Sequence, residues 1–249
     1  MKKVIIIGAS AGIGKALAEV FAGNGFAIGL TARRVELLKE LQTRLKTKTN
    51  TSAIANTSTY VKYMDLLKPE EAMKALEELI KEMGGVDIIV INSGVGNEGQ
   101  MLEFEKERAS IDVNVLGFTA MAITATNYFE RKGEGHIVGI SSVAAIRPYR
   151  TAPAYGASKA FMSFYLQGLR HKFAKQGFNI SITDIRPGFV YTPLTQNNKD
   201  MFWLATPEKA AEQIYDAIIK KKKYAYITKR WRLAAWVLRI IPDFIYNKF

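Results

Sequence analysis

Short apolar runs alternate along the chain with longer segments in which apolar residues recur every three or four positions. The short runs are rich in β-branched residues and predict strands, whereas the longer spacing predicts helices. The predicted strands are Val4–Ile7, Phe26–Thr31, Tyr60–Met64, Val86–Ile91, His136–Ser142, Asn179–Asp184 and Tyr224–Thr228. The predicted helices are Lys15–Ala22, Val35–Leu45, Pro69–Met83, Phe104–Arg131, Ala152–Gln176 and Pro207–Lys220. This alternation predicts a single α/β domain, built on a doubly wound parallel sheet of about seven strands with helices on both faces.

Two stretches between these elements follow neither pattern. Lys46–Ser58 is rich in Thr, Asn, Ser and Lys, which predicts a polar loop. Residues 189–206 are irregular but apolar and directly follow the sixth strand, a position typical of a lid over a substrate. We therefore expect one domain over residues 1–228 that includes this lid, followed by a basic, aromatic C-terminal segment at 229–249.

A glycine-rich turn follows the first strand. Gly8, Gly12 and Gly14 are spaced as Gly-x-x-x-Gly-x-Gly, directly before a predicted helix. Glycines let the backbone approach a phosphate closely, and the amino end of a helix attracts an anion. Any tight turn between a strand and a helix also favours glycine, but the position after an N-terminal apolar strand favours a nucleotide site.

The end of the second strand bears on which nucleotide binds. In a nucleotide-binding βαβ unit, an acid at this position holds the ribose 2′-hydroxyl, whereas an arginine accommodates a 2′-phosphate. Here the chain has Ala32, Arg33 and Arg34 and no acid. This favours NADP(H) as the cofactor, with NAD(H) as the second option. The alternative is that both arginines are solvated charges at the start of a helix and bind no phosphate.

Tyr155 and Lys159 lie four residues apart in a predicted helix and so share one of its faces. A tyrosine has a pKa near ~10, and a fixed positive charge beside it favours the phenolate. Ser142, at the end of the fifth strand, could join them in polarising a carbonyl and passing it a proton. The alternative is that the tyrosine and the lysine belong to an ordinary helix surface.

Asn114 interrupts an apolar helical stretch, and a polar amide in such a place needs hydrogen-bond partners. Either a bend in the backbone satisfies this amide, or it takes part in a water or proton relay. The sequence pattern does not decide between these two alternatives.

Composition and charge narrow the function classes. The chain has no cysteine and only two histidines, which excludes disulfides and thiolate sites, fits a cytoplasmic location and makes a bound metal unexpected. No stretch reaches the ~20 apolar residues of a membrane span. The net charge is +12, but residues 220–249 contain nine Lys or Arg against one Asp, so most of the excess lies at the C-terminal end. A single basic segment without a reading motif does not indicate nucleic acid.

In these motifs the chain resembles the short-chain dehydrogenase/reductase family. The resemblance covers residues 3 to about 228 and rests on the glycine turn, Asn92-Ser93-Gly94, Asn114, Ser142, Tyr155-x-x-x-Lys159 and Pro187-Gly188. It implies a Rossmann-type sheet and a catalytic tetrad of Asn114, Ser142, Tyr155 and Lys159. In that tetrad Tyr155 would be the general acid or base, Ser142 would polarise the carbonyl, and Lys159 would lower the pKa of the phenol and bind a ribose. Asn114 would hold a water that links Lys159 to solvent.

The same resemblance implies the residues that bind the cofactor. They are Gly8, Ser10, Gly12, Ile13, Gly14, Arg33, Arg34, Asp65, Asn92, Gly94, Tyr155, Lys159, Pro187, Gly188 and Thr192. The chain departs from the family pattern in three places. Ile7 stands where the family often has Thr, and Ile91-Asn92-Ser93-Gly94 replaces Asn-Asn-Ala-Gly. Ala11 stands where many NADP-dependent members have a second basic residue, so Arg33 carries the 2′-phosphate argument almost unaided.

The expected function is that of an oxidoreductase that transfers a hydride between NADP(H) and a carbonyl or alcohol substrate. The apolar residues of the predicted lid favour an apolar substrate. A non-catalytic dinucleotide-binding regulator or a membrane-associated scaffold is the alternative, although neither has a chemical use for Ser142 and Tyr155. We expect a homodimer or homotetramer. Residues 229–249 mix Trp and aliphatic residues with Lys and Arg, which suits either peripheral membrane contact or packing against another subunit.

Overall fold

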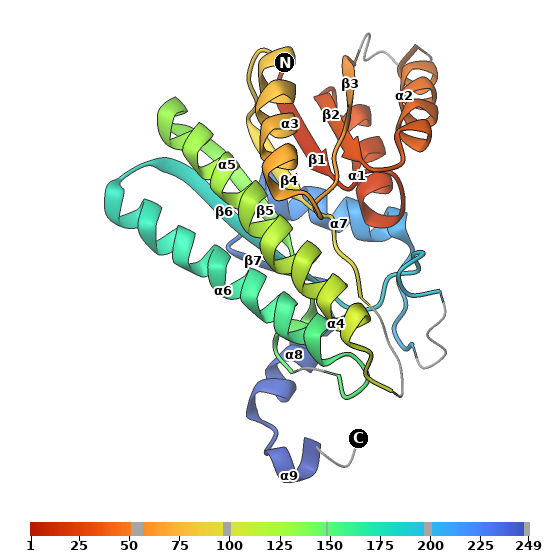
Figure 1. Ribbon diagram of the computed structural model, residues 1–249, viewed down its shortest axis with the longest axis vertical. Coiled ribbons are helices and arrows are strands. Elements are labelled where there is room, and N and C mark those ends of the chain that lie inside the picture. The colour runs from red at the N-terminus through yellow and green to blue at the C-terminus, as the bar shows by residue number, and fades with distance from the viewer. Residues whose placement is uncertain (51–56, 97–100, 148, 197–200, 247–249) are drawn as a thin grey trace.

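The protein is described by a computed structural model, which covers residues 1–50, 57–96, 101–147, 149–196 and 201–246. Within these residues the strands form one parallel sheet in the order β3-β2-β1-β4-β5-β6-β7 (Figure 1). The strands are β1 Lys3–Ile7, β2 Ala27–Ala32, β3 Thr59–Tyr63, β4 Ile88–Ile91, β5 Glu134–Ile140, β6 Asn179–Pro187 and β7 Tyr224–Ile227. The strand order reverses between β1 and β4, and the ends of these two strands form the crevice where ligands bind in open α/β sheets.

Helices cover both faces of the sheet, as the sequence predicts. The helices are α1 Gly12–Gly23, α2 Val35–Asn50, α3 Pro69–Glu82, α4 Phe104–Ile111, α5 Phe118–Lys132, α6 Pro153–Gln176, α7 Pro207–Ile219, α8 Trp231–Ile240 and α9 Asp243–Tyr246. One face carries α1, α2 and α7, and the other carries α3, α5 and α6 (Figure 1). Val4 and Ile6 of β1 belong to the first core, and Ile5 and Ile7 belong to the second. A strand buried on both faces needs apolar residues at every position, which explains its continuous apolar run.

The main correction to the predicted elements concerns Lys46–Ser58. The helix α2 continues to Asn50, so the first five residues of this predicted loop are helical; residues 51–56 lie outside the described residues. The Thr47 hydroxyl donates to the Thr43 carbonyl oxygen at 3.1 Å, and the Thr43 hydroxyl donates to the Lys39 carbonyl oxygen at 3.1 Å. These bonds satisfy the hydroxyl groups inside the helix, so the polar composition does not end it.

The sequence predicts one helix over Phe104–Arg131, but the structure divides this stretch. A π-helical turn at Asp112–Gly117 separates α4 from α5, and such turns frequently occur at functional sites. By length and composition alone, the combined stretch Phe104–Lys132 is long and apolar enough to span a membrane. This qualifies the expectation from the sequence that no stretch has the length and apolar character of a membrane span. However, 61% of its most apolar window is buried inside the protein, as in a core helix.

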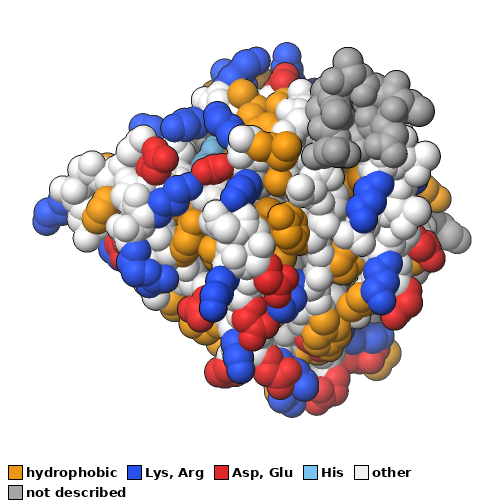
Figure 2. All heavy atoms as spheres, turned by 90° about the horizontal axis from the view of Figure 1, so that it is seen from above, with side chains coloured by type: hydrophobic (Ala, Val, Ile, Leu, Met, Phe, Trp, Pro, Cys, Tyr) orange, Lys and Arg blue, Asp and Glu red, His pale blue; other side chains and the backbone are white. Residues whose placement is uncertain are grey.

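The two edges of the sheet differ in their surroundings. Figure 2 shows the molecule from the side where the strands begin, and there acidic and basic side chains are interspersed. At the opposite edge, α8 and α9 stand beyond the carboxyl ends of the strands (Figure 1). The C-terminal segment is interrupted at Pro242, because α8 ends at Ile240 and α9 begins at Asp243.

Candidate active site

A cavity of about 420 Å³ lies at the carboxyl edge of the sheet. It is bordered by the ends of β1 to β6 and by the start of the predicted lid. Of the residues predicted for the site, those that line it are Gly8, Ser10, Gly12, Ile13, Arg33, Arg34, Asp65, Asn92, Gly94, Ser142, Tyr155, Lys159, Pro187, Gly188 and Thr192. Gly14 and Asn114 do not line the cavity; each packs behind one of its walls. The fold therefore brings motifs from distant parts of the chain to one place.

The glycine turn forms one end of this cavity. Gly8 has a φ of +89°, a backbone conformation that residues other than glycine rarely adopt. The Asn92 amide nitrogen donates a hydrogen bond to the Gly8 carbonyl oxygen at 2.8 Å. A Cβ atom on Gly14 would lie 2.1 Å from that same oxygen, so only glycine fits there. The start of α1 has no acidic residue in its first turn and no capping side chain among the described residues, which leaves its N–H groups available to an anion.

The end of β2 places two arginines at the rim of the same region. Arg33 and Arg34 are exposed and line the cavity. The Arg34 Nη2 atom donates to the Ser10 hydroxyl at 3.0 Å, so this arginine is tied to the glycine turn. Arg33 therefore has the freer side chain of the two for a phosphate, and its role in cofactor preference stays a prediction.

Ser142, Tyr155 and Lys159 form the other end of the cavity. Ser142 lies two residues beyond the end of β5, where its hydroxyl accepts a hydrogen bond from the Ala144 backbone N–H at 3.1 Å. Its own proton faces the Pro187 carbonyl oxygen at 3.5 Å, a distance well above that of a strong O–H···O bond. The hydroxyl is thus held in position but remains able to donate to a substrate.

Lys159 is buried beneath Tyr155. Its Nζ atom lies 5.7 Å from the centre of the Tyr155 ring and donates to the Ile140 carbonyl oxygen at 3.0 Å. Burial lowers the pKa of Lys159 from 10.5 to about 8, and attraction to Asp184 opposes part of this change. An opposite charge brought near the amine would therefore stabilise its ammonium form.

Asn114 acts on the site from outside the cavity. Its Oδ1 atom accepts from the Val95 backbone N–H at 2.9 Å, and its Nδ2 atom donates to the Val95 carbonyl oxygen at 2.7 Å. Nδ2 also donates to the Ser158 hydroxyl at 2.9 Å, which in turn donates to the Tyr155 carbonyl oxygen at 2.7 Å. The Val95 backbone, in the turn after β4, and the Ser158 hydroxyl thus satisfy the amide, and a relay through a water stays a prediction.

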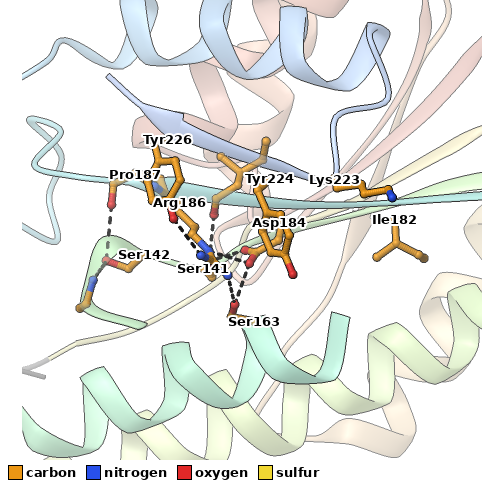
Figure 3. Close-up of polar contacts among 12 residues, drawn as sticks. Ser141, Ser142, Ser163, Ile182, Asp184, Arg186, Pro187, Lys223, Tyr224 and Tyr226 are labelled. Carbon is orange, nitrogen blue, oxygen red and sulfur yellow. Dashed lines mark hydrogen bonds and ion pairs between the residues drawn. The ribbon is translucent and has the colours of Figure 1, made fainter. Parts of the chain in front are cut away.

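A buried polar network that sequence reasoning missed lies beside Ser142 (Figure 3). Its Asp184 carboxylate is close enough to Lys159 to raise the pKa of that amine. Asp184 of β6 is 0% exposed and accepts hydrogen bonds from Ser141, Ser163 and Arg186. Burial by itself lowers the pKa of Arg186, but Asp184 and Tyr226 outweigh this effect and hold it above its usual value. The network ties β5, β6, β7 and α6 together beside Ser142 and near Lys159. The sequence signal was an acid and an arginine two residues apart at the end of the sixth predicted strand.

The predicted lid contacts the C-terminal segment, which the sequence also did not indicate. Within the lid, whose residues 197–200 lie outside the described residues, Phe189 and Phe202 pack against Trp231 of α8 with ring centres 5.6 Å and 5.1 Å away. A Cβ atom on Gly188 would lie 2.1 Å from the Trp231 ring. The first residue of α8 is therefore part of the wall that supports the cavity.

Comparisons with known proteins agree with this geometry. A family model described as short chain dehydrogenase matches residues 2–202. An uncharacterized oxidoreductase of Myxococcus xanthus is 30% identical over 251 residues, which cover 99% of this chain and 95% of that protein. A short-chain dehydrogenase from Sphingobium yanoikuyae in complex with NADPH has a TM-score of 0.81 at 24% identity, with 98% of this chain and 97% of that chain covered.

A short-chain dehydrogenase/reductase from Burkholderia phymatum in complex with NAD has a TM-score of 0.83 at 19% identity, with 95% of this chain and 92% of that chain covered. The structural similarity thus extends to proteins that hold either nicotinamide dinucleotide. Because the family model spans most of the chain and the fold and motifs agree with it, the protein belongs to the short-chain dehydrogenase/reductase family of oxidoreductases.

Proposed function

We propose that the protein transfers a hydride between NADP(H) and an apolar carbonyl or alcohol substrate. The observation that carries this proposal is that Ser142, Tyr155 and Lys159 share one cavity with the glycine turn. A phosphate cradle at one end and an acid–base pair at the other match the two ends of a dinucleotide-dependent reaction. The cytoplasmic location expected from the sequence stays a prediction.

The residues around the cavity fit a nicotinamide dinucleotide. The glycine turn and the start of α1 would hold the pyrophosphate, and Asp65, Asn92 and Gly94 line the stretch between the two ends. Arg33 would pair with a 2′-phosphate, since Ala32 beside it has no group to bond a ribose hydroxyl. Pro187, Gly188 and Thr192 would border the nicotinamide. When bound, this group supplies or accepts the hydride.

The protein's own part in the reaction is to hold and move a proton. In the reducing direction the Tyr155 phenol donates its proton to the carbonyl oxygen, while the Ser142 hydroxyl donates a hydrogen bond to the same oxygen. In the oxidising direction the Tyr155 phenolate takes the proton from the alcohol. The Lys159 ammonium favours that phenolate by its charge, and the Ile140 carbonyl oxygen fixes the position of the amine.

The walls near the catalytic residues support an apolar substrate. Val95, Val190 and Leu194 line the cavity, and aromatic rings of the lid and α8 pack beside it. Such walls exclude water from the reacting groups and favour apolar ligands with one polar group near Ser142.

Turnover of a panel of apolar ketones with NADPH tests the proposal. We expect Tyr155→Phe to lower kcat/KM by roughly 10²–10⁴-fold, because it removes the proton but keeps the ring. NADPH binding, followed by its fluorescence, serves as the control and should change little. If the wild type binds NADPH but turns over no member of the panel, a non-catalytic regulator or scaffold becomes the better description. Near-normal turnover by Tyr155→Phe would refute the mechanism.

A further inference from the structure

The helix α8 is fixed to the body of the protein by one of its faces. Trp231 and Ala235 on this face are buried, and Ala234 and Leu238 are partly buried. Arg147 holds the far end, because its guanidinium donates to the Leu238 carbonyl oxygen at 3.0 Å and to the Ile241 carbonyl oxygen at 2.7 Å. The helix therefore has a defined orientation on the surface.

The opposite face of α8 is also apolar. Leu233, Trp236, Val237 and Ile240 follow each other at helical spacing, and we call these four residues the outer stripe. They are 68%, 60%, 43% and 59% exposed. Phe244 of α9 extends the apolar surface and is 70% exposed. A helix on the surface of a soluble protein normally has polar residues on its outer face. An exposed apolar face such as the outer stripe therefore indicates a binding surface.

Basic side chains flank the outer stripe. Arg232 and Arg239 are exposed, and α8 contains no acidic residue. The one acid of residues 229–249, Asp243, forms an ion pair with Arg147. These residues contain five Lys or Arg against that single acid. An apolar stripe with a cationic flank is complementary to an anionic lipid surface, into which the stripe can sink while the arginines reach the headgroups.

We propose that the outer stripe of α8, together with Phe244, is a docking surface for an anionic lipid bilayer. A second copy of the chain is a poorer occupant, because two such helices in contact would bring arginines together with no acid of α8 to pair them. Docking would also place the lid next to the bilayer, since Trp231 on the inner face packs against Phe189 and Phe202. An apolar substrate dissolved in the lipid could then enter the cavity directly. This last step rests on the proposed function, whereas the docking itself does not.

Co-sedimentation of the full-length protein with vesicles tests the docking without substrate or turnover. Two kinds are compared, pure phosphatidylcholine and a three-to-one mixture of phosphatidylcholine with phosphatidylglycerol. We expect binding to the mixed vesicles and about 25-fold weaker binding for the double variant Arg232→Gln/Arg239→Gln, at about fivefold for each charge. The variant Leu233→Gln/Ile240→Gln should lose about tenfold or more on either vesicle.

The matched control is Ile219→Gln, which changes an exposed apolar residue at the end of α7, by the edge where the strands begin. It should bind like the wild type. The fluorescence of Trp236 offers a second measurement, because brominated lipid should quench the wild type more than Trp236→Phe. Absence of binding, or equal binding by all variants, would overturn the proposal. A lower oligomeric mass of Leu233→Gln/Ile240→Gln without any vesicle binding would overturn it as well, in favour of a second copy on this face.

Discussion

Arg33 occupies the position at the end of β2 from which a side chain reaches the ribose of a bound dinucleotide. It is exposed, lines the cavity and follows Ala32, which has no polar side chain, while the next residue, Arg34, is tethered to Ser10. Replacing it with Asp should change the preference between NADPH and NADH, because a carboxylate repels the 2′-phosphate and bonds the ribose hydroxyls. We expect the ratio of kcat/KM for the two cofactors to fall roughly 10- to 150-fold, the equivalent of one charge-assisted interaction.

Steady-state kinetics with both cofactors measure this ratio. Lys39→Asp makes the same charge change on the exposed surface of α2 and should leave the ratio unaltered. If Arg33→Asp also leaves the ratio unaltered, the NADP assignment fails.

Lys159 links the chemistry of the site to the stability of the protein. Burial lowers the pKa of Lys159 from 10.5 to about 8. Between these two values the unfolded chain binds more protons than the folded protein, so the free energy of unfolding rises with pH across that window. In Lys159→Met this contribution is absent. We expect the wild type to gain on the order of 3 kcal/mol relative to Lys159→Met between pH 7.5 and pH 10.5. Urea denaturation of both proteins at several pH values measures the difference, and curves that stay parallel would contradict the burial of a charged amine.

The residues of the site fall into two groups, those that a local sequence motif identifies and those that only long-range contacts identify. Gly8, Ser142 and Tyr155 act through a local motif, so the sequence was sufficient to place them in the cavity. Asp184 and Trp231 were not found, because each becomes important only through partners far away in the chain. A spacing rule carries no information about such contacts.

At the level of elements, the apolar pattern predicted every strand of the sheet within a few residues. A parallel strand is buried on both faces, and its composition differs sharply from that of a helix. The error in Lys46–Ser58 arose because polar residues at the end of α2 can bond back to the helix, so composition does not mark where it stops. The contact between Gly188, directly after β6, and Trp231 of α8 had no signal in either segment taken singly.

The substitution Gly188→Ala tests that contact. A Cβ atom on Gly188 would lie 2.1 Å from an atom of the Trp231 ring, which fills this space. In Gly188→Ala the ring must move, and with it the start of α8 and the lid. We expect a loss of about 1–3 kcal/mol in the free energy of unfolding and a lower kcat/KM. Gly168→Ala is a suitable control, since a Cβ atom on this glycine of α6 would meet no atom within 4 Å. That change should stabilise the protein by about 0.5–1 kcal/mol. Equal stability of both variants in urea denaturation would show that Trp231 adjusts freely.

Across the whole molecule, the two sheet edges have different roles. The edge where the strands begin carries interspersed charges of both signs (Figure 2). The opposite edge combines the cavity, the lid and the basic α8. The excess positive charge of residues 220–249 is divided between these two edges. Lys220 to Lys223 directly precede β7, whereas Lys229, Arg230, Arg232 and Arg239 follow it.

A second apolar surface, on α4 to α6, accounts best for the expected homo-oligomer. Leu116, Ile123, Phe161 and Phe164 on this side are exposed, Phe164 by 77%, and α5 and α6 lie next to each other (Figure 1). An apolar surface of this kind on two adjacent helices is typical of contacts between subunits.

We therefore expect a dimer or tetramer that assembles through these helices. The double variant Ile123→Asp/Phe164→Asp should be a monomer in analytical ultracentrifugation, because a buried unpaired carboxylate is costly. The outer-stripe variant Leu233→Gln/Ile240→Gln should keep the mass of the wild type. If it becomes monomeric while the α5–α6 variant does not, the assignment of the two apolar surfaces must be exchanged.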